Sequence, residues 1–485
     1  MPISLESFFL DPDTEGTLQA RIQQMVAQGI LAGRFRPGEK LPSSRKMAQH
    51  LGVSRITVTL AYTELVADDY LTSRGRSGYF VSQNAPEPPS FPARRPEGGS
   101  VDWSRAIGNR FSPAFGMEKP SDWAKYKYSF IYGQADPSLF DTANWRLCAL
   151  QALGKRDFSA LTADYFDGDD PQLVNFIAQH TLPRRGILAG PDEILITMGA
   201  QNALWLTAQV LLTQRRRAAI EDPCYPALRA ILTQSRCQLS LVKVDAEGLP
   251  PEGVPTGTDV VFTTPSHQCP TTATMPISRR KALLAKAEED DFLVVEDDYE
   301  FEMAFRSAPS PSLKSLDQNG RVIHVGSFSK SLFPGLRLGY LVGPAPLIRE
   351  ARALRASVLR HAPGHIQRTA SYYLSLGHYD ALVRKMSRAY FERRQILDAE
   401  LLRHNIAMAG QGAFGGSSVW VAVNEDVDTA QLARRLRADG VLIEPGAPFF
   451  AGTAPPRHFI RLAYSSIPAN RIADGIALIA GALKE

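Results

Sequence analysis

Residues 326–340 read GSFSKSLFPGLRLGY and place a lysine in a turn rich in serine and glycine, between two short apolar runs. A lysine amine can hold an aldehyde cofactor as a Schiff base, and Lys330 is the candidate for that bond. Hydroxyl groups and an arginine can bind a phosphate, and Ser327, Ser329 and Arg337 flank this lysine. The segment therefore predicts a site for a phosphorylated aldehyde, although a lone lysine in a loop is more often a solvated charge.

Other apolar runs end in residues that would complete such a site. A carboxylate keeps a pyridine nitrogen protonated, and Asp297 follows the run FLVVE. Tyr299, two residues later, is expected to reach the phenolic oxygen of the cofactor, and Tyr225 can stack on its ring. Arg461, in FIRLAYSSI, is suited to the carboxylate of a bound ligand. Each residue alone is more often a helix cap or a salt-bridge partner, so the prediction depends on their occurrence together.

The stretch MGAQNAL at 198–204 is typical of a turn from a strand into a helix. Free N–H groups at a helix start bind phosphate, which makes the backbone of Ala200 and Gln201 the candidate cradle. The chain has four cysteines, none in a C-x-x-C pair and none clustered with histidines. A metal site and a disulfide framework are therefore not expected, and a reducing cytoplasm fits this pattern.

Strands must carry these residues, because apolar runs alternate with helical patterns along most of the chain. We expect helices at 202–214 and 278–290. Such alternation predicts an α/β fold with a largely parallel sheet. From about residue 370, an amphipathic helix and short strands such as SSVWVAV predict a smaller α+β subdomain. The expected strands lie at 193–200, 218–223, 259–265, 292–298, 321–328 and 338–343.

The N-terminal segment has a different pattern, helix, glycine turn and helix, which is typical of a helix-turn-helix. Two short strand-like runs follow around a turn that carries arginines and would form a wing. Residues 33–82 hold eight basic and four acidic residues, and the basic ones gather where phosphates and groove edges would lie. A small domain for protein contacts would be the alternative. The residues expected to meet DNA are Ser44, Arg45, Ser54, Arg55, Thr57, Arg74 and Arg76.

A stretch dense in proline, glycine and serine, SQNAPEPPSFPARRPEGGS, separates the two segments and is typical of a linker. We therefore expect a DNA-binding domain at 1–82, a linker at 83–122 and an effector domain at 123–485. The net charge of +4 over 485 residues does not by itself indicate nucleic acid. No apolar run reaches the roughly 20 residues of a membrane helix, and residues 1–16 lack the pattern of a signal peptide. We expect a cytoplasmic protein.

The motif GRFRPGEKLPSSRKMAQHLGVSRITV, at residues 33–58, resembles the GntR winged-helix family. The order of GAQNAL, DPCYP, TPSHQCP, VEDDYEFE, GSFSKSLFPGLRLGY and RLAY resembles the fold-type I aminotransferases, which use pyridoxal 5'-phosphate (PLP). The whole chain is similar to the MocR/GabR family of transcriptional regulators. The resemblance implies that arginines at the positions of Arg45 and Arg55 contact operator DNA and that the wing enters the minor groove. It also implies a homodimer, arranged head-to-tail, in which Tyr165 reaches the neighbouring site.

The chain departs from the aminotransferase pattern at two places. Residues 269–272 read Cys-Pro-Thr-Thr where aminotransferases have Asn-Pro-x-Gly, and Cys269 is a weak substitute for the asparagine that hydrogen-bonds the phenolic oxygen. Ala200 stands where a serine would add a phosphate hydroxyl. These changes favour a sensor that forms an external aldimine with an amino acid or amine and stops there, without physiological turnover. A working aminotransferase with an accessory DNA-binding domain, or a body that only dimerises, stays open.

Overall fold

The computed structural model describes residues 2–11, 15–86, 101–107, 120–164, 166–307, 310–410, 412 and 415–484. Much of the linker expected at 83–122 lies outside these ranges, and so does Tyr165. Contacts between residues divide the chain into two compact units, Met1–Gly108 and Asn109–Glu485. Each unit is described by itself.

The N-terminal unit packs three helices against a two-stranded antiparallel wing, in which Leu71 lies opposite Val81. The turn between the second and third helices uses Gly52, at a φ of +68°, where glycine has no steric penalty. Ser54 then begins the next helix, since its side chain accepts a hydrogen bond from the N–H of Thr57. The helix-turn-helix with a wing is confirmed. Its elements are α1 (Leu18–Leu31), α2 (Ser44–Leu51), α3 (Arg55–Ala67), β1 (Leu71–Ser73) and β2 (Tyr79–Val81).

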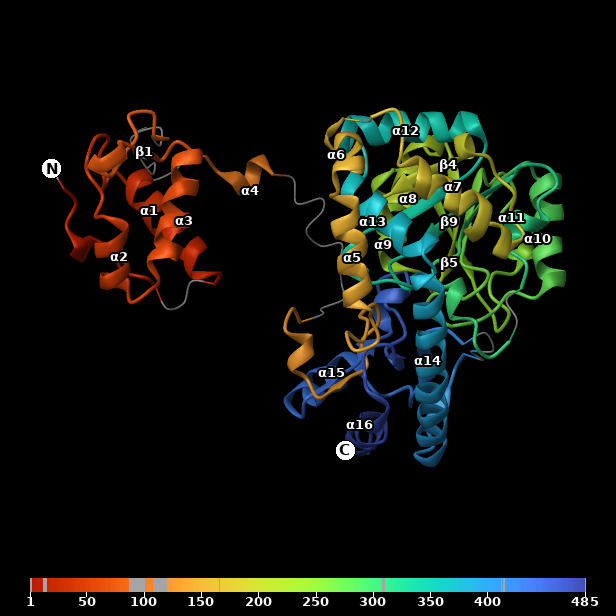
Figure 1. The fold of residues 1–485 in the computed structure, drawn as a ribbon. Coiled ribbons are helices and arrows are strands. Elements are labelled where there is room, and N and C mark those ends of the chain that lie inside the picture. Colours follow the sequence, from red (N-terminus) through yellow and green to blue (C-terminus); the bar gives the residue numbers. More distant parts are fainter. Residues whose placement is uncertain are drawn as a thin grey trace. The chain divides into compact units, whose positions relative to one another are not determined.

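The C-terminal unit is built on a seven-stranded sheet with the order β4-β10-β9-β8-β7-β5-β6 (Figure 1). β10 is antiparallel to both of its neighbours, and the other pairings are parallel. The largely parallel sheet is confirmed, and β6 is an edge strand that the apolar runs did not predict. The strands are β4 (Ile194–Thr197), β5 (Arg217–Asp222), β6 (Gln238–Lys243), β7 (Val260–Thr263), β8 (Leu293–Asp297), β9 (Val322–Ser327) and β10 (Gly339–Val342).

Helices cover both faces of this sheet, because successive strand residues point to opposite sides. Val295 packs with one apolar cluster, and its neighbour Val294 packs with another. The helices whose residues join the first cluster are α8 (Ala200–Leu211), α9 (Pro226–Gln234) and α12 (Ala345–Leu359). Those that join the second are α10 (Ile277–Glu289) and α11 (Leu313–Leu316).

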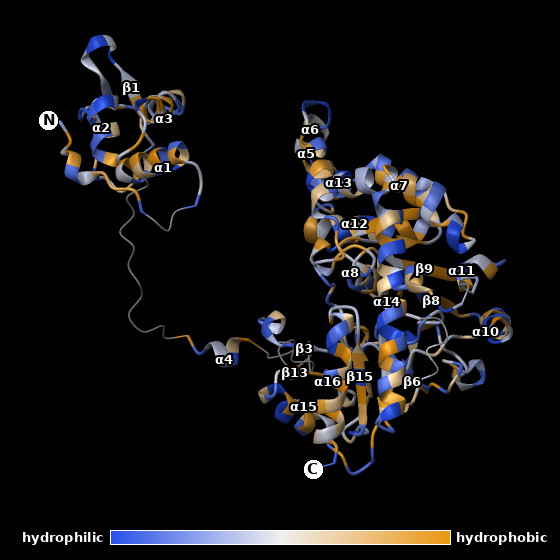
Figure 2. Cartoon of the chain, turned by 60° about the horizontal axis from the view of Figure 1, so that its bottom comes forward, coloured by the Kyte–Doolittle hydropathy of each residue, from blue (hydrophilic) through white to orange (hydrophobic). Residues whose placement is uncertain are grey.

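A smaller α+β subdomain follows, as the sequence predicted, and α14 packs along α16 within it (Figure 1). Figure 2 shows strands β9 and β15 as hydrophobic, whereas α14 alternates between hydrophobic and hydrophilic residues. The sheet has the order β11-β12-β15-β14, and it is antiparallel. Its elements are α14 (His378–Arg403), β11 (Ala407–Met408), β12 (Ser418–Ala422), α15 (Thr429–Ala438), β14 (Glu444–Pro445), β15 (Phe459–Ala463) and α16 (Ala469–Ala482).

The remaining helices and strands lie outside these two sheets. They are α4 (Trp103–Ala106), β3 (Tyr128–Ser129), α5 (Thr142–Ala152), α6 (Lys155–Thr162), α7 (Pro171–Phe176), α13 (Gly364–Ser375) and β13 (Val441–Leu442), which pairs with β3. A π-helix spans Ile177–Thr181, and 3-10 helices lie at Leu5–Ser7, Gly75–Ser77, Trp123–Lys125, Pro183–Arg185, Pro191–Glu193, Pro251–Gly253, Phe301–Met303, Pro334–Leu336 and Ala447–Phe449.

Three glycines bring strand ends and a turn into close contact at one edge of the sheet. A Cβ on Gly339 would lie 2.8 Å from the carbonyl oxygen of Gly326 and 2.9 Å from the carbonyl carbon of Gly199. Both neighbours are backbone atoms, so neither can move aside cheaply. Glycine at position 339 therefore sets how closely β10 approaches the turn that starts α8.

Gly339→Ala is expected to lower the free energy of unfolding by roughly 1–3 kcal/mol, the usual cost of overpacking. Urea unfolding would measure the change. Gly481→Ala is the control, because a Cβ there meets no atom within 4 Å and alanine is favoured over glycine inside a helix. Equal stability of the Gly339→Ala and wild-type proteins would contradict the close approach.

Candidate functional site

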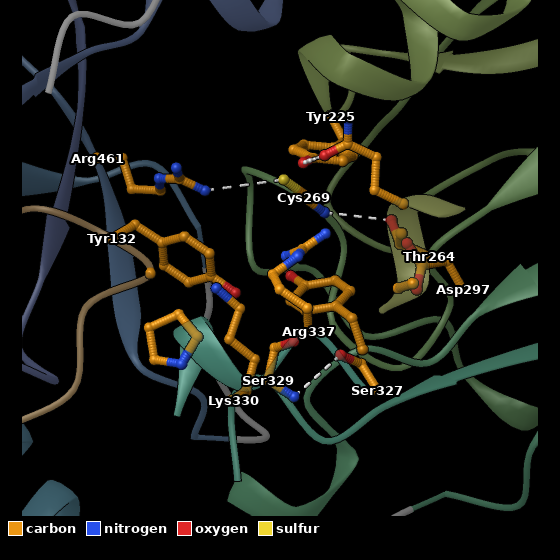
Figure 3. A pocket seen from close by; sticks show the side chains of 15 residues that line it. Tyr132, Tyr225, Thr264, Cys269, Asp297, Ser327, Ser329, Lys330, Arg337 and Arg461 are labelled. Carbon is orange, nitrogen blue, oxygen red and sulfur yellow. Dashed lines mark hydrogen bonds between the residues drawn. The ribbon is translucent and has the colours of Figure 1, made fainter. Parts of the chain in front are cut away.

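A cavity of about 240 Å³ opens where strands of the large sheet end (Figure 3). Parallel strands bring their carboxyl ends to one edge, so residues far apart in sequence meet there. The cavity gathers all the residues that the sequence assigned to a cofactor or an effector. Its lining is Tyr132, Gly133, Ala200, Gln201, Tyr225, Thr264, Cys269, Asp297, Tyr299, Ser327, Ser329, Lys330, Pro334, Arg337 and Arg461.

One end of the cavity has the groups that bind phosphate. α8 begins at Ala200 directly after Gly199, so the N–H groups of its first turn are directed at this end. A Cβ on Gly199 would lie 3.3 Å from Nη2 of Arg337, and this nitrogen donates a hydrogen bond to the carbonyl of Met198 at 3.1 Å. The buried Oγ of Ser329 has no hydrogen-bond partner among the residues described. A helix start, an arginine and a buried hydroxyl together fit a phosphate.

Asp297 lies at the end of β8 with a buried Oδ1 that finds no hydrogen-bond donor in the described part of the chain. Burial, followed by the like charges of Asp298 and Glu221, raises the pKa of this carboxyl to about 8 from its usual 3.8. The positive charge of Lys330 opposes this rise in pKa but does not outweigh it. A protonated ring nitrogen would supply both the charge and the missing donor, so the site fits a pyridinium group.

A buried ion pair behind β8 keeps the neighbouring carboxylate charged. Nε of Arg185 lies 2.6 Å from Oδ2 of Asp298, and both side chains are almost completely buried. Burial opposes the ionisation of Asp298, but Arg185 and other polar contacts outweigh it and hold its pKa below the usual value. Asp298 therefore presents a fixed negative charge next to Asp297. This pairing was not predicted, because nothing near Arg185 in the sequence marks it.

Tyr132 lies between the two cationic side chains of the cavity (Figure 3). The Nζ of Lys330 is 3.7 Å from the centre of its ring, and the Cζ of Arg461 is 4.1 Å from the same centre. Both distances are within the range of cation–π attraction. Sequence reasoning did not assign a role to Tyr132, although it stands in the segment YGQADP. An amine-bearing ligand that reaches both cations must meet this ring.

Arg461 is held in place by Glu444 of the neighbouring strand. Its Nε donates to Oε2 of Glu444 at 2.7 Å, and both side chains are buried. Its Nη1 approaches the sulfur of Cys269 at 3.8 Å. The guanidinium has five N–H donors, so a paired Arg461 can still contact an anionic ligand. Glu444 was missed because its link to Arg461 depends on the register of β14 and β15.

The groups expected at the cofactor's phenolic oxygen are weak or already engaged. Tyr299 donates its hydroxyl proton to the carbonyl of His267 at 2.9 Å, so its only proton is not directed at a cofactor. Burial raises the pKa of the Cys269 thiol to about 11, and a thiol is a weak donor. Tyr225, which is expected to stack on the ring, donates its hydroxyl proton to Oε1 of Gln201 at 3.3 Å, so it does not add a donor to the phenolic oxygen. The sequence predicted a weak hydrogen-bond donor to the phenolic oxygen at Cys269. The structure adds a second donor, Tyr299, that is engaged elsewhere.

The residues predicted to meet DNA lie on α2, α3 and the wing. Arg45 and Arg55 are exposed, and Nε of Arg55 donates to Oγ of Ser44 at 3.5 Å. Ser54 and Thr57 are tied to each other, with their hydroxyl oxygens 2.8 Å apart at the cap of α3. In the wing, Arg76 is exposed, as is Arg74, whose Cζ lies 4.7 Å from the centre of the Phe80 ring.

Within the described ranges, no three His, Cys, Asp or Glu side chains are placed to hold a metal ion. None of the helices described has the length and apolarity needed to cross a membrane.

Two families match this sequence. Residues 18–81 match bacterial regulatory proteins of the gntR family, and residues 142–478 match aminotransferase class I and II. The HTH-type transcriptional regulator TauR of Rhodobacter capsulatus is 58% identical over the full length of both chains. The probable rhizopine catabolism regulatory protein MocR of Rhizobium meliloti is 28% identical, over 96% of this chain and 94% of its own.

Solved structures of aminotransferases share the fold of the C-terminal unit. An archaeal alanine:glyoxylate aminotransferase is 25% identical with a TM-score of 0.71, over 79% of this chain and 99% of its own. LysN, the α-aminoadipate aminotransferase of Thermus thermophilus, is 27% identical with a TM-score of 0.71, over 79% of this chain and 98% of its own.

Asp297→Asn is expected to stabilise the cofactor-free protein at high pH. Between about pH 4 and pH 8 the folded carboxyl keeps a proton that the unfolded chain has lost, so the free energy of unfolding of the wild type falls as the pH rises. The variant lacks this loss and should gain roughly 2–4 kcal/mol over wild type at pH 8.5. Near pH 4.5 the gain should shrink to about 1 kcal/mol, because this pH lies only slightly above the carboxyl's usual pKa of 3.8.

Urea unfolding at the two pH values measures this difference. Asp426→Asn, at an exposed position, is the control and should unfold like the wild type. A gain for Asp297→Asn that is the same at both pH values would contradict a raised pKa at Asp297.

Proposed function

Because this chain belongs to the MocR/GabR family of transcriptional regulators, which join a gntR-type DNA-binding domain to an aminotransferase-like domain, we propose that it senses an amine through PLP. In this proposal Lys330 would hold PLP covalently through its amine, and an amino acid or amine effector would take the place of the lysine on the cofactor. The observation that carries the proposal is the position of Lys330. It lines one cavity with the start of α8 and with Asp297, whose Oδ1 has no hydrogen-bond partner among the residues described.

PLP would supply an aldehyde carbon that can exchange one amine for another. The side chains of the cavity would bind and orient the cofactor and the effector. The first turn of α8 and Arg337 would hold the phosphate, and Asp297 would keep the ring nitrogen protonated. Tyr225 covers the ring, with its hydroxyl fixed by Gln201. Arg461, oriented by Glu444, receives an anionic end of the effector. Tyr132 closes the space between that arginine and Lys330.

Two observations favour a sensor over a working aminotransferase. The thiol of Cys269 is a weak donor, and the hydroxyl of Tyr299 already donates its hydrogen bond to the backbone carbonyl of His267. The phenolic oxygen, which a turnover enzyme stabilises with strong donors, is therefore poorly supported. An aminotransferase that carries an accessory DNA-binding domain is the second candidate, favoured by the presence of the lysine, carboxylate and arginine together. Formation of a keto acid at a steady rate from any amino donor would decide for it.

The proposed regulator acts as a head-to-tail homodimer in the cytoplasm. α5 and the segment after it expose several large apolar side chains, a pattern that marks interaction surfaces. We propose that the DNA-binding domain spans 1–82, the linker 83–122 and the effector domain 123–485. The exposed apolar residues of α5 and of the segment after it are Leu147, Leu150, Leu153 and Phe158.

Effector binding alters operator affinity only if the two states of the dimer bind the effector with different affinities.

Lys330→Ala is expected to abolish the visible absorbance band of the PLP-loaded protein, because Lys330 is the one lysine among the described residues that line the cavity. Borohydride reduction followed by mass spectrometry of peptides locates the bond in the wild type. Lys281→Ala, at an exposed site on α10, should leave both signals unchanged. A persistent band in Lys330→Ala, or the modification of another lysine, would overturn the assignment.

A further inference from the structure

The first turn of α3 exposes an isoleucine to solvent. Ile56 is 72% exposed, and Leu60, one turn later, is 48% exposed. The other large apolar residues of α3 lie on its opposite face and are buried in the core of the N-terminal unit. They are Val58, Tyr62 and Leu65. The buried face already anchors α3 to the core of the unit. Ile56 and Leu60 on the other face are therefore available to contact a binding partner.

The surroundings of Ile56 identify the chemistry of that occupant. Arg55 precedes it, and Arg55 is linked through Ser44 to the start of α2, which also carries Arg45. Neither α2 nor α3 has an acidic residue in its first turn. A cationic rim around an aliphatic side chain is complementary to a polyanion that also offers apolar groups. DNA has both, since each thymine presents a C5-methyl group in the major groove.

The side chains on either side of Ile56 restrict which residues can read bases. Ser54 and Thr57 share a hydrogen bond at the helix cap, and the N–H of Thr57 also donates to Ser54. Their polar atoms are thus engaged in starting the helix. The N-terminal residues of a recognition helix contact base edges, and Ile56 is the member of this turn with an exposed side chain and no polar atom.

We propose that Ile56 determines operator specificity by packing against the methyl group of one thymine in each half-site. This inference rests on DNA binding by the helix-turn-helix and is independent of the cofactor. Replacing thymine by uracil removes that methyl and leaves the hydrogen-bonding edge intact. The exposed position of Ile56 means that substitution there leaves the core of the unit intact.

The experiment measures the affinity of the full-length chain for operators selected from random duplexes. Each thymine is then replaced singly by deoxyuridine. One replacement per half-site should weaken binding by the wild type about fourfold, as expected for one buried methyl group. Ile56→Ala should bind the thymine operator more weakly, and this variant should lose the difference between thymine and uracil at that position.

Two variants separate this contact from general effects. Arg55→Ala should weaken binding but keep the fourfold penalty for uracil, since its charge acts on phosphates or other bases. Leu60→Ala, the matched loss of an exposed aliphatic group farther along α3, should also keep the penalty. The proposal fails if the wild type is indifferent to every uracil or if Ile56→Ala retains the full penalty. It fails equally if Ile56→Ala changes only self-association in sedimentation, which would make this face a protein interface.

Discussion

A carboxylate buried without a donor is the constraint on which the effector cavity depends. Asp297 has an unpaired oxygen at the end of β8, and Asp298 beside it is kept charged by Arg185. A second buried negative charge beside Asp298 is costly unless a cation joins it, so the Asp297 carboxyl keeps its proton up to about pH 8 in the cofactor-free protein. The cavity supplies room for such a cation between the start of α8 and Lys330. Among the residues described, none donates a hydrogen bond to Oδ1 of Asp297. This unsatisfied acceptor marks the cavity as a binding site.

Much of this site follows from the sequence for a physical reason. Parallel strands deliver their last residues to one edge, so Asp297 and Ser327 meet although 30 residues separate them. The contacts that escaped prediction depend instead on register and packing. Glu444 reaches Arg461 only through the pairing of β14 with β15. Tyr132 reaches Lys330 from a segment far upstream in the sequence.

In the DNA-binding unit, too, local features can be predicted from the sequence, whereas the use of individual side chains depends on packing. Gly52 and Ser54 mark the turn and the start of α3 through local backbone requirements, which a sequence reveals directly. The exposure of Ile56 agrees with the helical apolar pattern, because Val58, Tyr62 and Leu65 form the buried face of α3 and Ile56 lies opposite. That pattern alone assigns no role to the exposed residue. The polar neighbours Ser54 and Thr57, expected to meet DNA, are partly used in capping the helix.

The central claim is that chemistry at Lys330 changes the binding of DNA. The most direct measurement is the operator affinity of the PLP-loaded, full-length chain, with and without each member of a panel of amino acids and amines that shift its visible band. The account predicts that at least one such compound changes the affinity of the wild type and leaves that of Lys330→Ala unchanged. The same response in both proteins would contradict it.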